Sequence, residues 1–141
     1  PPLKAKGLDG DYRLLADFGG AVLAGHPTSY GVEFVTWEWD YQHTGMWQGH
    51  YYGNNYAGAK QDFAVRSGLI PRAQIFEQDE LDELYLCCQR TRELDDTLTY
   101  QGEQQIIKAQ EHIEAISPGV QERVAAMELK QQEPQFEQTM Y

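Results

Sequence analysis

Aromatic and carboxylate side chains alternate in one short stretch of the chain and could together bind a small ligand. Residues 37–41 read Trp-Glu-Trp-Asp-Tyr, and a second aromatic group follows at residues 47–52. Exposed aromatic rings stack on sugars or bases, and carboxylates beside them accept hydrogen bonds from ligand hydroxyls. The candidate ligand-binding residues are Glu38, Asp40, Trp47, His50 and Tyr51.

The same aromatic residues can instead form a hydrophobic core, and this interpretation is favoured. A two-stranded hairpin is not stable alone in water, so other elements must cover one of its faces. Val35, Trp37, Trp39 and Tyr52 supply an apolar face of this kind. We therefore expect the tryptophans to turn inward and to pack a small sheet against covering helices.

Catalytic chemistry has weak support in the sequence. Glu38 and Asp40 are two residues apart on a predicted strand and share a face, which could raise one carboxyl pKa if the pair were buried. An exposed, solvated face is favoured, because acidic side chains are seldom buried unpaired. The chain has neither a phosphate-binding glycine motif nor a Gly-x-Ser-x-Gly motif. We predict no catalytic residue and a protein that is not an enzyme.

Metal and cofactor sites are not expected either. The four histidines are scattered, and His50, which could act as a base or a ligand, has no further ligands at fixed spacing. Cys87 and Cys88 are adjacent, so a disulfide between them would be strained. We expect them to lie on a helix, with one facing the core.

The net negative charge of the chain limits the classes of molecule that it is expected to bind. The formal net charge of −11 opposes contact with phosphate backbones, so direct nucleic-acid binding is disfavoured. A predicted acidic surface contains Glu77, Asp79, Glu80, Asp82 and Glu83. Such a surface is usually a solvated helix exterior. The bolder alternative is that the acids imitate DNA phosphates, as in an antirestriction-type inhibitor that occupies the basic groove of a DNA-binding protein.

Several elements must position these residues. Residues 11–24 show apolar residues at helical spacing, which predicts a helix, although Gly19 and Gly20 weaken it. Residues 32–41 and 46–52 predict two strands joined by a four-residue loop. If Tyr41 pairs with Met46, then Trp39 faces Gln48, Trp37 faces His50 and Val35 faces Tyr52.

Helices are predicted for the rest of the chain. One follows Asn54 and Asn55 and ends at Gly68, one begins at about Gln78, and one spans residues 100–116. Ser117 and Pro118 read as a cap and first residue of a last helix. We expect an α+β fold in which an antiparallel aromatic hairpin is covered by about four to five helices. Residues 1–10 should be a flexible segment, 11–131 a single domain, and 132–141 a disordered tail.

Two stretches carry a resemblance to a known but uncharacterised domain. The first is Phe34–Tyr41, followed by Thr44-Gly45 and Gly49-His50-Tyr51-Tyr52, and the second is Ala59–Leu69. They resemble a domain that recurs in proteins encoded by conjugative elements of gut Firmicutes, often as one module of a longer polypeptide. The resemblance implies a mobile-element context and assigns neither a reaction nor site residues.

These observations together predict a noncatalytic protein-interaction module of a mobile-element protein, with an unidentified protein partner. No apolar run is long enough for a membrane helix, and no signal peptide is recognised, so we expect a cytoplasmic protein without membrane contact. The alternatives are the acidic DNA mimic and a small-ligand or carbohydrate binder that uses the aromatic hairpin.

Overall fold

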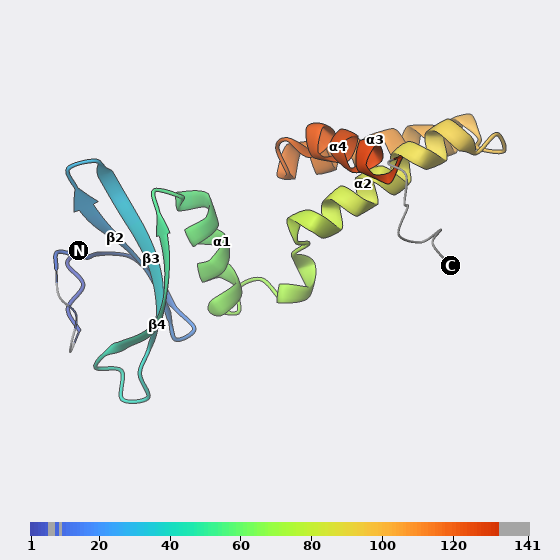
Figure 1. Cartoon of the computed structure of the whole chain (residues 1–141). Helices are drawn as coiled ribbons and strands as arrows, with labels where there is room; N and C mark the ends of the chain where they lie inside the picture. The colour runs from blue at the N-terminus through green and yellow to red at the C-terminus, as the bar shows by residue number, and fades with distance from the viewer. Residues whose placement is uncertain (6–7, 9, 133–141) are drawn as a thin grey trace, which may run out of the picture. The chain divides into compact units, whose positions relative to one another are not determined.

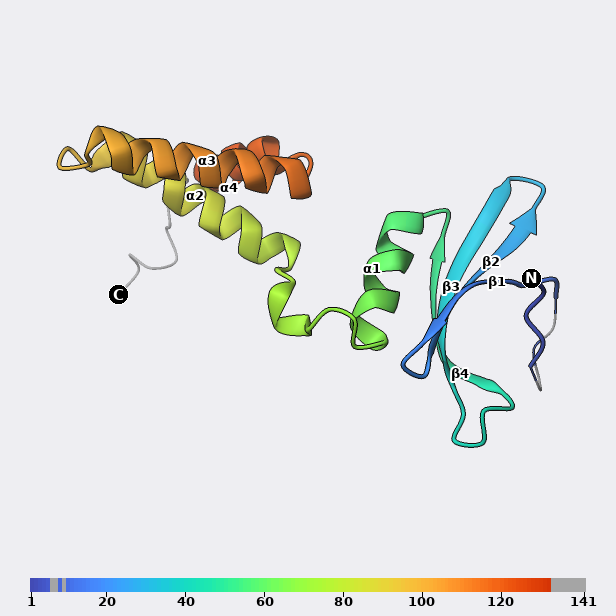
Figure 2. The same ribbon diagram turned by 180° about the vertical axis from the view of Figure 1, so that it is seen from behind.

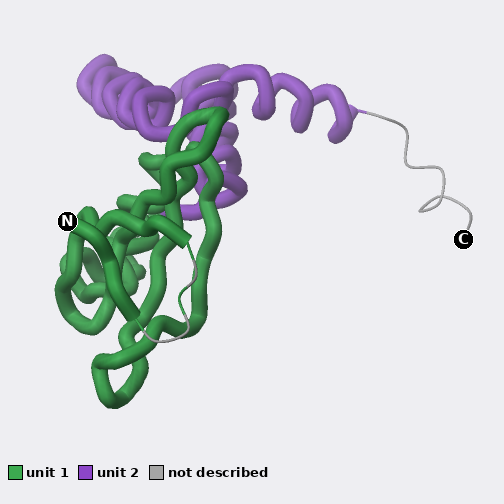
Figure 3. The backbone as a smooth tube through the Cα atoms, turned by 90° about the vertical axis from the view of Figure 1, so that its left-hand side faces the viewer, with its two compact units in different colours: residues 1–75 green, residues 76–141 purple. Residues whose placement is uncertain are grey.

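Four antiparallel strands and four α-helices make up the described part of the chain, which is the α+β class expected from the sequence. The structure is a computed structural model and describes residues 1–5, 8 and 10–132. The expected disordered tail therefore lies, apart from Gln132, outside the described residues. The chain divides into two compact units, residues 1–75 and 76–141 (Figure 3), where one folded core was expected.

The first unit contains a meander sheet with the strand order β1-β2-β3-β4 (Figure 1). Its strands are β1 (Arg13–Phe18), β2 (Ala21–Thr28), β3 (Gly31–Trp39) and β4 (Met46–Gly53). The helix predicted over residues 11–24 is wrong, because this stretch forms β1 and the first half of β2. Gly19 and Gly20 have φ angles of 60° and 82° and form the two-residue turn between the strands, a conformation that glycine adopts without a Cβ clash.

The β3–β4 hairpin exists as predicted, but its register is shifted. Trp39 pairs with Met46, Thr36 with His50 and Val35 with Tyr51. The predicted register assumed a four-residue loop and an unbroken ladder. Instead the loop is longer, because residues 40–45 separate the paired Trp39 and Met46, and the ladder shifts between its Thr36 and Glu38 pairs. This irregularity lies beside Gln48, which has a φ of 51°.

One face of the sheet packs against α1 (Tyr56–Arg66), which follows β4 directly (Figure 2). Ala21 and Leu23 of β2 form a buried cluster with Ala59 and Phe63 of the helix. The Asn55 side chain accepts a hydrogen bond from the Gly58 amide, so the predicted N-terminal cap is confirmed. The Gly19 turn lies directly against the end of α1, since a Cβ built there would be 2.1 Å from the Ser67 carbonyl oxygen.

The opposite face of the sheet contains Trp37. Its ring is 5% exposed and packs with Leu3, Val22, Ala24 and Val35. Trp37 therefore turns inward as expected, but it is covered by the N-terminal segment and not by a helix. That segment was expected to be flexible. In its described part, the Leu3 amide bonds to the Tyr12 carbonyl, and Pro2 forms a β-bridge with Arg13.

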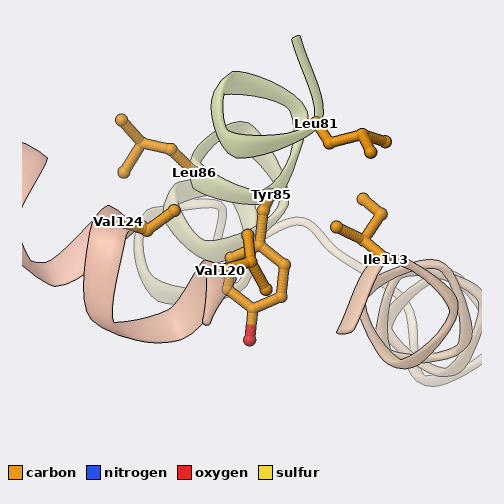
Figure 4. Packing of buried hydrophobic residues seen from close by; sticks show 6 residues of the cluster. All are labelled: Leu81, Tyr85, Leu86, Ile113, Val120 and Val124. Atoms are coloured by element: carbon orange, nitrogen blue, oxygen red, sulfur yellow. The ribbon is translucent and has the colours of Figure 1, made fainter. Parts of the chain in front are cut away.

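The second unit is built from three helices, α2 (Gln78–Leu94), α3 (Tyr100–Ile116) and α4 (Val120–Gln131), after a short 3-10 helix at Arg72–Gln74. α2 contacts both other helices, and Tyr85 projects from it between α3 and α4 (Figure 4). The last helix does not begin at Ser117-Pro118 as predicted. Gly119 precedes it with a φ of 84°, so the chain turns sharply before the first helical residue. The buried cluster is Leu81, Tyr85, Leu86, Ile113, Val120 and Val124.

The two units differ strongly in charge. Residues 76–141 hold 15 of the 22 acidic and 5 of the 11 basic side chains, which is a net formal charge of −10. Residues 1–75 hold 7 acidic and 6 basic side chains, a net charge of −1. The acidity of the chain is therefore a property of the helical unit, while the sheet unit is nearly neutral.

Candidate functional site

The β4 strand is one edge of the sheet and carries exposed aromatic side chains. Trp47 is 53% exposed and Tyr51 is 70% exposed. The pairing with β3 places Trp47 opposite Glu38 and Tyr51 opposite Val35, so the two rings lie on opposite faces of the sheet. The sequence of β4 from Met46 to Gly53 contains no Lys, Arg, Asp, Glu or Pro. We call residues 46–53 the β4 edge.

The neighbouring helix holds this edge in place through a buried carboxylate. The Asp62 side chain on α1 is 11% exposed. Its Oδ2 atom accepts a hydrogen bond from Thr36 Oγ1 of β3 at 2.5 Å and lies 2.9 Å from His50 Nδ1 of β4. One carboxylate therefore joins the helix to two adjacent strands.

Arg66, one helical turn after Asp62, completes the connection. Its side chain is 7% exposed, and its Nη2 atom donates to the Gln48 carbonyl at 2.6 Å. Nη1 donates to Thr36 Oγ1 at 3.0 Å, and Nη2 lies 3.7 Å from Glu38. The guanidinium thus satisfies a carbonyl at the point where β4 departs from regular pairing.

The electrostatics of the network agree with an Asp62 side chain that is ionised at neutral pH. Burial opposes ionisation of this carboxyl, but hydrogen bonds from Thr36, His50 and Tyr52 outweigh burial and lower its pKa. Burial, together with the hydrogen bond and the charge of Asp62, raises the pKa of Tyr52 to about 12. The tyrosine therefore stays neutral and donates to the carboxylate over the whole physiological range.

The residues proposed from sequence as a ligand site separate in space. His50 joins the Asp62 network, and Glu38 lies at its margin near Arg66. Asp40 is in the loop after β3, where its carboxylate accepts the Thr44 amide, and hydrogen bonds led by this one lower its pKa. Trp47 and Tyr51 lie on different faces. The five residues thus share an edge strand and its loop, but they do not converge on one pocket.

Acid–base chemistry would need more than the His50–Asp62 pair supplies. An Asp that orients a His is half of a hydrolytic arrangement, which also requires a nucleophile within reach of the imidazole. In the described part of the chain, the side chain of His50 makes one hydrogen bond, and it goes to Asp62. Across residues 1–5, 8 and 10–132, no group of three His, Cys, Asp or Glu side chains is arranged to hold a metal ion.

The predicted acidic surface needs one correction. Asp82 is buried at 7% exposure and forms a bidentate ion pair with Arg123 of α4, with oxygen to nitrogen distances of 2.9 and 3.1 Å. It therefore holds α2 to α4 and does not lie on the surface. Glu77 and Glu80 form the capping box of α2, while Asp79 and Glu83 are exposed.

The two cysteines lie on α2 as expected, Cys87 exposed and Cys88 partly buried. Burial, with a smaller contribution from Cys87, raises the pKa of the Cys88 thiol. A raised pKa leaves little reactive thiolate at neutral pH. This favours a structural role for Cys88.

A cavity of about 330 Å³ lies between α2 and α4, lined by residues that include Tyr85, Gln89, Gln121 and Glu128. Two of its polar groups already have a partner, because Glu114 on α3 accepts hydrogen bonds from both Tyr85 and Gln121 at 2.7 Å. Small-molecule sites are mostly apolar with a few free polar groups. The cavity therefore resembles a gap between helix surfaces more than a binding pocket.

The residues that sequence reasoning missed are those that anchor the edge, namely Thr36, Tyr52, Asp62 and Arg66. Tyr52 was assigned to the apolar core face, and the other three were not singled out. A usable signal was present, because Asp62 and Arg66 are four residues apart beside the apolar face of the predicted helix.

Comparison of the chain with protein-family models, with curated proteins and with solved structures finds no match. Within the described residues, none of the helices combines the length and the apolar character needed to cross a bilayer.

Proposed function

We propose that this chain is a noncatalytic protein-interaction module of a mobile-element protein, that it acts in the cytoplasm, and that it binds its partner at the β4 edge. The observation that carries the proposal is an edge strand without a charged residue, which presents Trp47 and Tyr51 to solvent. Tyr and Trp are enriched in the energetically important parts of protein interfaces.

The anchoring of β4 supports a binding role. Asp62 and Arg66 fix the strand from the α1 side, through His50 and the Gln48 carbonyl. A strand held in this way loses little conformational freedom when it binds, and less lost freedom means tighter binding for the same contacts. The β4 edge is thus preorganised for binding a partner.

A noncatalytic role agrees with the state of the polar groups. The Asp62 carboxylate accepts hydrogen bonds from several neighbours and has a lowered pKa, which makes it a poor base. The aromatic rings do not form the platform that a carbohydrate binder needs, because Trp37 is buried and Trp47 and Tyr51 lie on opposite faces.

The acidic side chains support the DNA-mimic alternative less than they support a structural role within the helical unit. Several of them have structural partners within the helical unit: Asp82 binds Arg123, Glu103 lies near Arg92, and Glu114 binds Tyr85. Phosphate imitation needs carboxylates free to meet a basic groove. Acids that hold helices together are explained without such a partner.

Affinity capture from the native host, with matched variants, tests the proposal. Trp47→Ala and Tyr51→Ala should each lose the proteins that the unaltered chain retains. Tyr30→Ala removes an aromatic side chain that is even more exposed, 99% in the turn between β2 and β3, and this variant should keep the captured proteins. Capture of the same proteins by all three variants, or turnover in a substrate screen, would contradict the proposal.

A further inference from the structure

We infer that the β4 edge binds an extended segment of a different protein, one with net positive charge, as a fifth strand of the sheet. This inference rests on the proposed function and goes further by naming the mode of binding and the chemistry of the partner. In strand addition, backbone hydrogen bonds supply affinity and alternating side chains supply specificity.

The two edges of the sheet differ in a way that singles out β4. The β1 edge carries Arg13 and Asp17, and it is partly paired by the chain itself, since Pro2 bridges Arg13 and the Leu14 amide bonds to the Pro1 carbonyl. Natural proteins protect edge strands with charges, prolines and covering segments. The β4 edge contains none of these charges or prolines along its eight residues.

The shape of β4 defines where a fifth strand would lie. Pairing with β3 is irregular near Gln48, whereas Thr36 with His50 and Val35 with Tyr51 are consecutive pairs. His50 and Tyr52 face α1, and Tyr51 faces the side of Trp37, whose ring it meets edge-on at 6.2 Å. A segment paired at residues 50–52, before the second shift of the ladder at Gly53, would therefore contact aromatic side chains on both faces of the sheet.

Charge favours a foreign segment over a second copy of the chain. Two copies would each bring a net charge of −11, and like charges oppose association. Glu38 and Asp40 lie at one end of β4, and the basic Arg66 is buried. A segment rich in Lys or Arg would be attracted to the net negative charge of this chain, whereas a second copy would be repelled by it.

The test uses a phage-displayed library of random twelve-residue peptides selected against the whole chain, because the natural partner is unidentified. Selected peptides should be enriched in Lys and Arg, and they should slow hydrogen exchange at β4 amides without changing it in α4. Tyr51→Ala should weaken binding on the order of tenfold, as expected for a central interface aromatic. Tyr30→Ala should leave binding unchanged.

Backbone methylation of a selected peptide separates strand addition from other modes. Only every second amide of an added strand bonds to the neighbouring strand. N-methyl groups on one set of alternating residues should therefore abolish binding, and N-methyl groups on the other set should leave binding intact; these two sets are the two phases. Equal sensitivity of the two phases would overturn strand addition while leaving an interaction at β4 in place. Failure to select any peptide, or selection of acidic ones, would also overturn the inference.

The two proposals can fail separately. If host proteins are captured through Trp47 and Tyr51 but the peptide shows no phase dependence, then the interaction module stands and its binding mode is wrong. If the β4 variants capture the same proteins as the unaltered chain, then the proposed function itself is wrong. A stable dimer that is lost on Tyr51→Ala would identify a second copy as the occupant and would contradict the inference.

Discussion

Arg66 on α1 donates a hydrogen bond of 2.6 Å to the backbone carbonyl of Gln48 on β4, at the residue where the edge strand leaves regular pairing. The guanidinium that makes this bond also bonds to Thr36, so one buried side chain joins the helix to β3 and β4. The geometry of the exposed edge thus depends on a residue that a partner would not touch.

Replacement of Arg66 by Met should therefore destabilise the sheet unit. The change removes the donor to the Gln48 carbonyl and the cation that lies 3.9 Å from the Asp62 carboxylate, and breaking a buried charge pair costs about 3 to 5 kcal/mol. Urea unfolding monitored by tryptophan fluorescence measures the loss. Lys60→Met, which removes an exposed positive charge from the same helix, is the control and should change stability by less than about 1 kcal/mol. Equal effects of the two changes would contradict the assigned role.

Gly19→Ala and Gly20→Ala form a second matched pair. Both positions have positive φ, so an L residue is strained at either one, by roughly 1 to 2 kcal/mol. A Cβ at Gly19 also meets the Ser67 carbonyl at 2.1 Å, whereas nothing lies within 4 Å of one at Gly20. Gly19→Ala should lower Tm clearly more than Gly20→Ala, measured by thermal unfolding of the two variants. Similar Tm values would show that the turn does not pack against α1.

Tyr52 should make stability depend on alkaline pH. Its pKa is raised to about 12 in the folded chain, from an ordinary value of 10.0, so the folded state holds the proton more tightly. This contribution is fully present below pH 10 and is lost as the pH rises from 10 to about 12. Absorbance of tyrosinate, compared between the unaltered chain and Tyr52→Phe, locates the titration. A Tyr52 that titrates at 10 would contradict the hydrogen bond to Asp62.

Asp62 should make the stability of the fold depend on acidic pH, whereas Tyr52 makes it depend on alkaline pH. Its folded pKa is lowered, so its contribution is present above the ordinary value of 3.8 and is lost as the pH falls through the lower folded value. Asp62→Asn removes this contribution, and urea unfolding at a series of acidic pH values should show a flatter profile for the variant. Identical profiles would mean that the carboxylate is not bonded as described.

In the helical unit, Asp82→Asn should lower the free energy of unfolding far more than Glu83→Gln does. Asp82 is buried against Arg123, while its neighbour Glu83 is exposed. Loss of the buried pair should destabilise the unit by about 3 kcal/mol, and the surface change should stay within about 0.5 kcal/mol. Helical circular dichroism during urea unfolding measures both values. A large effect of Glu83→Gln would instead support a functional acidic surface.

The sequence predicted the helices better than the sheet, for a physical reason. The helix over residues 100–116 has the predicted bounds, and Asn55 caps α1, because helix signals are local in the chain. β2 is a central strand buried on both faces at Ala21–Ala24, so its apolar residues do not alternate. A short apolar run of this kind cannot be told from a helix by periodicity alone. The Gly19-Gly20 pair, which is typical of a hairpin turn, indicated the structure of this stretch better than the spacing of its apolar residues.

The candidate site was predicted only in part, because its assembly depends on contacts distant along the chain. The exposed residues Trp47, His50 and Tyr51 were identified from their types and positions on a predicted strand. The register of these residues against β3 depends on an irregular pairing near Gln48, which no local sequence pattern predicts. The link from Asp62 to Thr36 spans 26 residues and follows only once α1 is placed on the sheet.

The uneven charge of the two halves has a consequence for handling the protein. Residues 1–75, with a net charge of −1, would retain an unguarded edge strand but lose the electrostatic repulsion that the helices bring to the whole chain. Such strands are templates for self-assembly when nothing keeps identical molecules apart. The excised sheet should therefore form aggregates at concentrations that the whole chain tolerates, and residues 76–141 would serve it as a built-in solubility tag.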